Sequence, residues 1–117
     1  MKPTMIYGTA WKKEKTATLV ELAIQQGFRA LDTACQPKHY NEKLVGVGVQ
    51  KALLSTNLTR EDLFLQTKFT PPDGQDPNNI PYNPADPIEK QIKTSLAVSK
   101  ENLQTDYLDS LVLHSPI

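Results

Sequence analysis

Short runs of strand-forming residues alternate with helix-like segments along this chain of 117 residues, and this alternation restricts the folds it can adopt. Strands are expected over 5–11, 28–33, 63–69 and 107–114, with one helix between each pair. The order β-α-β-α-β-α-β predicts an α/β domain with parallel strands and right-handed crossovers. Asp32, Lys68 and His114 stand at the ends of the last three runs. Because the carboxyl ends of parallel strands meet at one edge, these side chains are expected to converge there with Tyr40 from a loop.

Apolar spacing predicts the first two helices, over 16–26 and 41–54. The expected apolar face of the first comprises Leu19, Leu22 and Ala23, widened by Val20 and Ile24, and that of the second comprises Val45, Val49, Ala52 and Leu53. Gly27 is expected just after the first C-cap, where a positive φ is needed. Gly46 and Gly48 cost the second helix roughly 1 kcal/mol each relative to Ala, which indicates close packing against the sheet or, alternatively, close approach of a ligand.

The third helix has the clearest predicted start, with Asp86 as N-cap, Pro87 at the first position and Glu89 as a capping-box partner. Its expected buried face comprises Ile88, Ile92, Leu96, Ser99 and Leu103. The preceding segment 70–85 reads as a long loop, and six of the nine prolines fall between 71 and 87. Loops of this length are often functional, so the segment could gate a site, and a tolerated surface insertion is the alternative.

Composition excludes several classes of protein. Thirteen basic residues balance thirteen acidic ones, and no basic stripe suggests nucleic acid as a partner. The sequence contains no apolar stretch of the ~20 residues needed to span a bilayer, and 1–7 lack the apolar region of a signal peptide. Cys35 is the only cysteine, so no internal disulfide can form. These features favour the reducing cytoplasm.

Asp32, Tyr40, Lys68 and His114 together have the chemistry to polarise and protonate a carbonyl group. A tyrosine with a pKa near ~10 keeps its proton at neutral pH and can act as an acid. A neighbouring lysine would stabilise the phenolate, and an aspartate would keep that lysine charged and oriented. A histidine opposite can donate a hydrogen bond to the carbonyl oxygen. The set holds no activated serine or cysteine nucleophile and lacks the spacing of a structural zinc site.

Each of these residues also has an ordinary structural explanation. Asp32 could cap a turn, Lys68 could be solvated, His114 could satisfy backbone groups and Tyr40 could be half-buried packing. Recurrence of ionisable residues at three successive strand ends favours a shared site, because an exposed surface would not require it. A barrel enzyme that uses Asp32 and His114 as metal ligands is a further alternative.

Four separated motifs resemble the aldo-keto reductases, whose fold is a (β/α)8 barrel. Gly8-Thr9-Ala10-Trp11 resembles the segment after the first core strand. Leu31-Asp32-Thr33-Ala34 with Tyr40-Asn41-Glu42 is similar to the family's Asp-Thr/Ser-Ala…Tyr-x-Asn-Glu signature. Gln66-Thr67-Lys68 resembles the end of strand three, and 106–116 resembles the stretch that carries the family histidine. The motifs occur in order across nearly the whole chain, and 32–41 with the Pro-rich loop looks most like fungal members.

The resemblance implies a fold and a set of roles. Residues 1–117 would supply strands one to four of a TIM-type barrel, the N-terminal half of an NADP-dependent oxidoreductase domain that reduces aldehydes and ketones. Tyr40 would be the general acid, tuned by Lys68 and Asp32, and His114 would orient the carbonyl. NADPH would supply the hydride, and cofactor contacts would come from Thr9, Trp11 and Asp32. The loop 35–39 is longer than usual in the family, which leaves His39 as a second candidate donor.

The expected half-barrel has consequences of its own. A complete barrel of this type needs ~250 residues, and in the family most contacts to the cofactor come from the second half. A four-stranded half exposes two edges and an apolar face, so marginal stability or self-association is expected. A non-catalytic half-barrel that works as an association module is therefore the alternative to a truncated enzyme.

Overall fold

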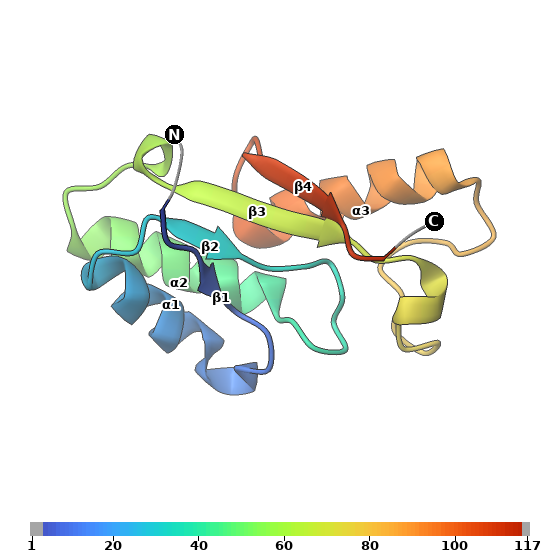
Figure 1. The fold of residues 1–117 in the computed structure, drawn as a ribbon, viewed down its shortest axis with the longest axis horizontal. Coiled ribbons are helices and arrows are strands. Elements are labelled where there is room, and N and C mark those ends of the chain that lie inside the picture. The colour runs from blue at the N-terminus through green and yellow to red at the C-terminus, as the bar shows by residue number, and fades with distance from the viewer. Residues whose placement is uncertain (1–3, 116–117) are drawn as a thin grey trace.

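The sheet of this protein has four parallel strands. The computed structural model describes residues 4–115. Its strands, β1 (Tyr7–Gly8), β2 (Ala30–Asp32), β3 (Phe64–Phe69) and β4 (Ser110–Leu113), are ordered β1-β2-β3-β4, and every neighbouring pair is parallel. The connecting helices, α1 (Thr16–Gln25), α2 (Glu42–Ser55) and α3 (Ile88–Leu103), lie on one side of the sheet (Figure 1). The predicted alternation and parallel pairing are confirmed.

Three of the strands are shorter than predicted, and the last of them, expected over 107–114, reduces to Ser110–Leu113. The expected 5–11 reduces to Tyr7–Gly8, and 28–33 reduces to Ala30–Asp32. Trp11 has a φ of 64°, which is incompatible with an extended strand and turns the chain into a short 3-10 helix, η1 (Lys13–Lys15). Among residues 4–115, no helix is long and apolar enough to cross a membrane.

Alternation along β3 separates the two faces of the sheet. Leu65, Thr67 and Phe69 are buried on the face that the helices cover, whereas Gln66 and Lys68 are only partly buried on the other face. The register pairs Gln66 with Asp32 on one side and with Ser110 on the other. Polar side chains of three strands are thereby placed on the face without helices.

The core lies between the sheet and the helices. It consists of Val20, Ile24, Leu31, Val45, Val49, Ala52, Leu63, Leu65 and Leu103. The predicted face of α2 is confirmed, with Leu53 partly buried at its margin. The predicted face of α1 is confirmed for Val20, Ala23 and Ile24. Leu22 is 48% exposed, and Thr16 and Ala17 are buried in addition. Gly27 has the expected positive φ, 114°.

The two glycines of α2 are sites of close packing, but against helices rather than against the sheet. A Cβ atom at Gly46 would overlap the main-chain oxygen of Asn102 in α3. A Cβ atom at Gly48 would lie 2.6 Å from the main-chain oxygen of Ala17 in α1. The missing side chains therefore let α2 lie close to both neighbours, which corrects the expected contact with the sheet.

The start and the buried face of α3 differ from the prediction. Pro87 is the N-cap and no side chain caps the helix. Asp86 Oδ2 lies 3.9 Å from Lys90 Nζ, and Glu89 pairs with Lys93 at 3.2 Å. Its buried residues are Gln91, Ser95, Ser99 and Leu103, whereas Ile88 is 41% exposed. This rotation follows from polar partners on the buried side that apolar spacing cannot reveal.

The Pro-rich loop is ordered and packs beside the carboxyl ends of the strands. It contains a 3-10 helix, η3 (Pro72–Gly74), and a bridge between Asp76 and Asn79. Gln75 donates to the Cys35 carbonyl at 2.9 Å, and the Tyr82 hydroxyl donates to the Thr70 carbonyl at 2.5 Å. The loop therefore fixes Thr70 and the segment that follows β2.

Candidate active site

An ion pair joins the ends of β2 and β3. Lys68 Nζ lies 2.7 Å from Asp32 Oδ2 and donates a second hydrogen bond to the Thr33 carbonyl at 3.2 Å. The side chains are 13% and 22% exposed, so the pair is shielded without being sealed from solvent. Adjacent parallel strands produce this contact because Asp32 is paired with Gln66, and Lys68, two residues further along β3, lies on the same face.

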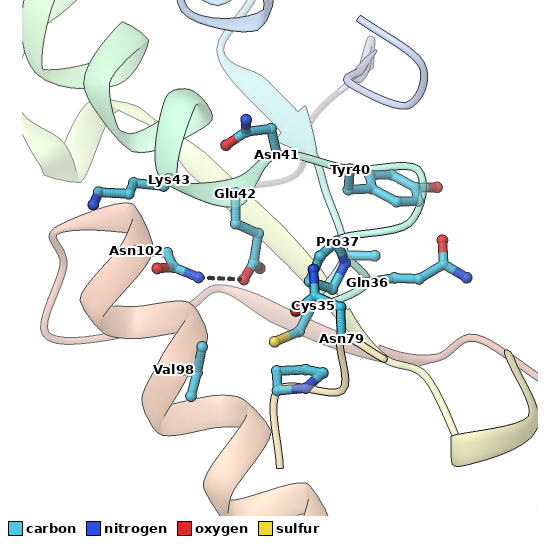
Figure 2. A pocket seen from close by; sticks show the side chains of 12 residues that line it. Cys35, Gln36, Pro37, Tyr40, Asn41, Glu42, Lys43, Asn79, Val98 and Asn102 are labelled. Carbon is cyan, nitrogen blue, oxygen red and sulfur yellow. Dashed lines mark hydrogen bonds between the residues drawn. The ribbon is translucent and has the colours of Figure 1, made fainter. Parts of the chain in front are cut away.

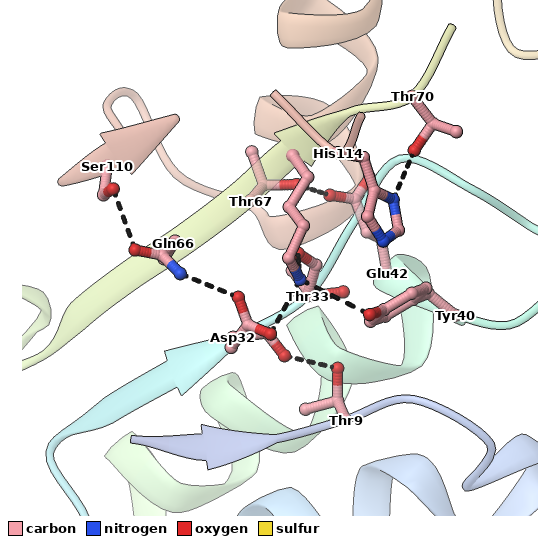
Figure 3. A network of polar contacts seen from close by, with 11 residues as sticks. Thr9, Asp32, Thr33, Tyr40, Glu42, Gln66, Thr67, Thr70, Ser110 and His114 are labelled. Carbon is pink, nitrogen blue, oxygen red and sulfur yellow. Dashed lines mark hydrogen bonds and ion pairs between the residues drawn. The ribbon is translucent and has the colours of Figure 1, made fainter. Parts of the chain in front are cut away.

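Tyr40 reaches this ion pair from the loop after β2. This loop contains a turn in which the amides of His39 and Tyr40 donate to the Gln36 carbonyl. Lys68 Nζ lies 3.4 Å from the Tyr40 hydroxyl oxygen. Figure 3 shows the Tyr40 hydroxyl at the edge of the polar network that includes Asp32 and Thr33. His39 stacks on Trp11 instead, with ring centroids 3.9 Å apart. The phenol rather than His39 therefore contacts the lysine.

His114 completes the group from the end of β4. Its Nδ1 lies 2.7 Å from the Thr70 hydroxyl, and its ring meets that of Tyr40 edge to face with centroids 5.8 Å apart. Burial, and then the positive charge of Lys68, hold the pKa of His114 below its usual value of 6.5. The imidazole is therefore neutral near pH 7. The motif around it includes Pro116, which lies outside the described residues.

Two further polar residues support Asp32 from β3 and β4. Gln66 Nε2 donates to Asp32 Oδ1 at 2.9 Å, and Gln66 Oε1 accepts from the Ser110 hydroxyl at 2.9 Å (Figure 3). Both Asp32 oxygens are thus held, one by Lys68 and one by Gln66. The alternative in which Asp32 and His114 are metal ligands is not favoured by these contacts. Asp32 is paired with Lys68, and His114 Nδ1 is hydrogen-bonded to the Thr70 hydroxyl.

Thr9 and Trp11, which were expected to contact the cofactor at the mouth of the barrel, are placed differently from each other. Trp11 is 65% exposed, as a residue at a mouth would be. Thr9 has no exposed surface, and its hydroxyl donates to the Asp32 carbonyl at 2.8 Å. Thr9 therefore braces the end of β2 and does not line an opening, because parallel pairing of β1 with β2 brings it beneath Asp32.

A second carboxylate, Glu42, lies on the helix-covered side at the start of α2. Figure 2 shows its side chain directed toward Asn102 of α3 and bordering a pocket of about 350 Å³. It accepts hydrogen bonds from Thr67 at 2.5 Å and from Ser99 at 2.9 Å. Burial raises the pKa of Glu42, although these bonds oppose the shift. Burial, and then the Glu42 carboxylate, raise the pKa of the neighbouring Cys35 thiol to about 11.

The arrangement can deliver a proton at the exposed edge of the sheet. A phenol touches an ammonium, the ammonium is held by a carboxylate, and a neutral imidazole faces the phenol. Sequence reasoning missed Gln66, Thr70 and the buried contacts of Glu42. Only the strand period carried a signal for Gln66, since alternation places it on the same face as Lys68.

Comparison with known proteins identifies relatives of this chain. The chain matches the model of the aldo/keto reductase family over residues 4–117. It is 33% identical over 107 residues to the NAD(P)H-dependent D-xylose reductase of Pachysolen tannophilus, covering 92% of this chain and 29% of that protein. It is 39% identical over 95 residues to the enzyme of the same name from Scheffersomyces stipitis, covering 81% of this chain and 25% of that protein. Fungal members are therefore among its relatives.

A solved structure shares the fold. The aldo-keto reductase of Bombyx mori, solved in complex with NADP, matches with a TM-score of 0.77 and 28% identity, covering 99% of this chain and 35% of that one. This chain spans about a quarter to a third of the length of these relatives. Its four parallel strands with helices on one face correspond to half of a (β/α)8 barrel, as the sequence predicted. The chain belongs to the aldo-keto reductase family.

Proposed function

We propose that this chain carries the proton-delivering half of an NADP(H)-dependent carbonyl reductase that converts aldehydes or ketones to alcohols. Residues 1–117 would contribute strands one to four of the barrel domain, and a second half would complete it. The observation that carries the proposal is the position of Lys68 Nζ, 2.7 Å from the Asp32 carboxylate and 3.4 Å from the Tyr40 hydroxyl.

Tyr40 would give its proton to the carbonyl oxygen as that oxygen gains charge. The Lys68 ammonium stabilises the phenolate left behind, and Asp32 keeps the ammonium charged and in place. His114 would donate a hydrogen bond to the same oxygen. If Nδ1 accepts the Thr70 hydroxyl proton, a neutral imidazole carries its own proton on Nε2, which is then the donor.

None of these side chains can donate a hydride, so the reduction needs a cofactor. A reduced nicotinamide supplies the hydride when it is bound. Two residues of this chain fit it on their geometry: Trp11 has an exposed aromatic ring, and the Asp32 carboxylate keeps 22% of its side chain accessible. Thr9 would not contact the nicotinamide directly. Its hydroxyl donates to the Asp32 carbonyl, so it would act only by positioning Asp32.

The decisive experiment complements the chain with its missing half. We would co-express it with the C-terminal segment of the Scheffersomyces stipitis reductase and follow NADPH absorbance with a broad-spectrum aldehyde. Tyr40→Phe should lower the turnover roughly 10²–10⁴-fold, as expected for loss of a general acid. Tyr107→Phe is the matched control, because Tyr107 lies at the other end of β4 and contacts Arg60. Equal activity in wild type and Tyr40→Phe would refute the role of the phenol.

A second candidate function is a non-catalytic association module. Leu111 and Leu113 of the edge strand β4 are 41% and 53% exposed, which favours pairing with another chain. On this proposal the chain elutes as an oligomer in size-exclusion chromatography, and Leu113→Lys shifts it toward the monomer. It would also show no change in nicotinamide fluorescence at high NADPH. A compact monomer that binds NADPH would contradict it.

A further inference from the structure

The residue that follows β3, Thr70, is buried behind the imidazole of His114. Its hydroxyl oxygen lies 2.7 Å from His114 Nδ1, and Figure 3 shows the two side chains directed toward each other. The backbone places them side by side, because the His114 amide donates to the Phe69 carbonyl at 2.9 Å. The contact therefore continues the parallel pairing of β3 with β4 beyond the ends of the strands.

The Pro-rich loop holds Thr70 on two further sides. The Thr70 carbonyl accepts hydrogen bonds from the Tyr82 hydroxyl at 2.5 Å and from Gln75 Nε2 at 3.2 Å, and both of these donors belong to buried residues. The Thr70 methyl group packs on Gly74, where an added Cβ atom would lie 2.7 Å from Thr70 Cγ2. With its carbonyl and its methyl group held in this way, Thr70 keeps its hydroxyl on the side of His114.

The loop is itself anchored to the strands on either side of the site. The Gly74 carbonyl accepts a hydrogen bond at 2.8 Å from Gln36 Nε2, in the segment that follows β2. The Tyr82 ring packs on that of Phe69 in β3, with centroids 5.4 Å apart. The loop thus supports Thr70 from the ends of two neighbouring strands.

The direction of the hydrogen bond between Thr70 and His114 follows from the single proton of the hydroxyl. Within residues 4–115, His114 Nδ1 is the only acceptor that this hydroxyl meets. Donation in the opposite sense, from Nδ1–H, would leave the buried hydroxyl proton without an acceptor, which is rare in folded proteins. Burial, and then the charge of Lys68, lower the pKa of His114 and keep the ring neutral. Nδ1 therefore accepts, and the one imidazole proton lies on Nε2.

We propose that Thr70, held by the Pro-rich loop, is a positioning residue that fixes the tautomer and the ring orientation of His114. The imidazole then presents an N–H group to the substrate oxygen, whereas the other tautomer would present a lone pair and lose the hydrogen bond. The long loop would thereby act on the reaction without touching the substrate. The effect on the reaction rests on the proposed function, but the tautomer is a property of the folded chain and can be measured without any reaction.

The direct test measures the tautomer of His114 by nitrogen-15 NMR of the full chain at about pH 8. Protonated and unprotonated ring nitrogens have different chemical shifts, and the sequence has only one other histidine, His39, which serves as an internal control. The wild type should show His114 protonated on Nε2. Thr70→Val keeps the shape but removes the hydroxyl, so a measurable Nδ1–H population should appear, and Thr70→Ser should restore the wild-type tautomer. A wild-type proton on Nδ1, or no change in Thr70→Val, would overturn the proposal.

Variants of the loop test its support of Thr70. Gly74→Ala would place a methyl group against Thr70 Cγ2, so the Thr70 side chain must turn and its hydroxyl must leave His114 Nδ1. Tyr82→Phe keeps the ring but removes the bond to the Thr70 carbonyl, and it should have a smaller effect in the same direction. A wild-type tautomer in both variants would overturn the role of the loop.

Kinetics of the complemented enzyme test the consequence for the reaction. Thr70→Val should lower kcat roughly 10- to 100-fold and change KM little, the range typical of hydrogen-bond partners that orient histidines in metal sites. Thr70→Ser should recover most of the activity. Thr56→Val is the matched control, because the Thr56 hydroxyl also donates a hydrogen bond, to the Ala52 carbonyl at 2.7 Å, but lies at the far end of α2. A changed tautomer with an unchanged kcat would overturn Nε2–H as the donor.

The two proposals fail in different ways. A tautomer that depends on Thr70, together with equal activity in wild type and Tyr40→Phe, would overturn the proposed function and leave the positioning of His114. Reduction that depends on Tyr40, together with a tautomer that is unchanged in Thr70→Val, would overturn the positioning role and leave the function.

Discussion

Asp32 and Glu42 stand at the two ends of one loop, and the fold treats these two carboxylates in opposite ways. Asp32 faces the open side of the sheet, where Lys68 supplies a full positive charge at 2.7 Å and part of its side chain stays accessible. Glu42 faces the helices, where Thr67, Ser99 and Asn102 supply only neutral donors and 4% of the residue is exposed.

The two carboxylates therefore have different roles. Asp32 belongs to a site for chemistry, whereas Glu42 with Thr67, Ser99 and Asn102 forms a buried structural joint between α2, β3 and α3. A carboxylate beside a lysine stabilises charge that a reaction creates nearby. A carboxylate enclosed by neutral groups fixes the elements that supply those groups. Glu42 lies two residues after Tyr40, and Thr67 lies one residue before Lys68. The joint on the covered side therefore sets the distance between the phenol and the ammonium on the open side.

The largest expected effect comes from removing the charge beside Asp32. Lys68→Met should lower kcat/KM of the complemented enzyme by roughly 10²–10⁴-fold, because the phenolate loses its counter-charge. The unfolding free energy should change by only about 1 kcal/mol, since both side chains remain partly accessible. Lys93→Met is the matched control, because its pair with Glu89 lies on the exposed surface of α3. A similar loss of activity in both variants would contradict a specific role for the Lys68–Asp32 pair in the chemistry.

Next in size is the loss of the buried joint. Glu42→Ala removes the acceptor of the hydroxyls of Thr67 and Ser99 and of the Asn102 amide, so the unfolding free energy in urea should fall by roughly 3 kcal/mol. Glu42→Gln keeps one acceptor oxygen and should lose less. A change below about 0.5 kcal/mol in Glu42→Ala would mean that the cluster contributes no stability.

A third effect concerns the thiol beside the joint. With its pKa near 11, Cys35 should react with iodoacetamide at pH 8 roughly 100-fold more slowly than a thiol with a pKa of 9, because that reaction needs the thiolate. Glu42→Gln removes a negative charge and should accelerate the reaction without equalling the unfolded chain. Mass spectrometry of quenched samples measures this rate. Rapid alkylation of the folded chain would show that the cluster is open.

The smallest effect is on the pH dependence of stability. The pKa of Glu42 is raised from 4.5, so the native state holds a proton that the unfolded chain releases. Stability from this group is complete below pH 4.5 and is lost as the pH rises through the folded pKa. The wild-type unfolding free energy should therefore fall above pH 4.5 relative to that of Glu42→Gln. Urea midpoints for the two proteins that stay parallel as the pH rises above 4.5 would contradict this.

Local rules predicted the parts of the structure that depend on backbone geometry. Gly27 follows a helix with a positive φ, and Asp32, Lys68 and His114 meet because parallel strands end at one edge. Apolar spacing predicted Ser99 and Leu103 of α3 but not Gln91, because a polar side chain is buried only where the fold supplies partners, as the Pro84 and Asp86 carbonyls do here. Thr70 was missed for the same reason, because its partner His114 lies 44 residues later.

The helix α2 carries glycines where it lies against the main chains of α1 and α3, and this has a consequence for which substitutions the chain can accept. Asn102 covers Gly46 with its main chain and bonds to Glu42 with its side chain, so one residue of α3 bears on both. A single methyl group added at Gly46 would push Asn102 outward and be felt at Tyr40 through the first turn of the helix. A substitution at Gly46, in the helical layer, would therefore disturb the candidate site on the opposite face of the sheet.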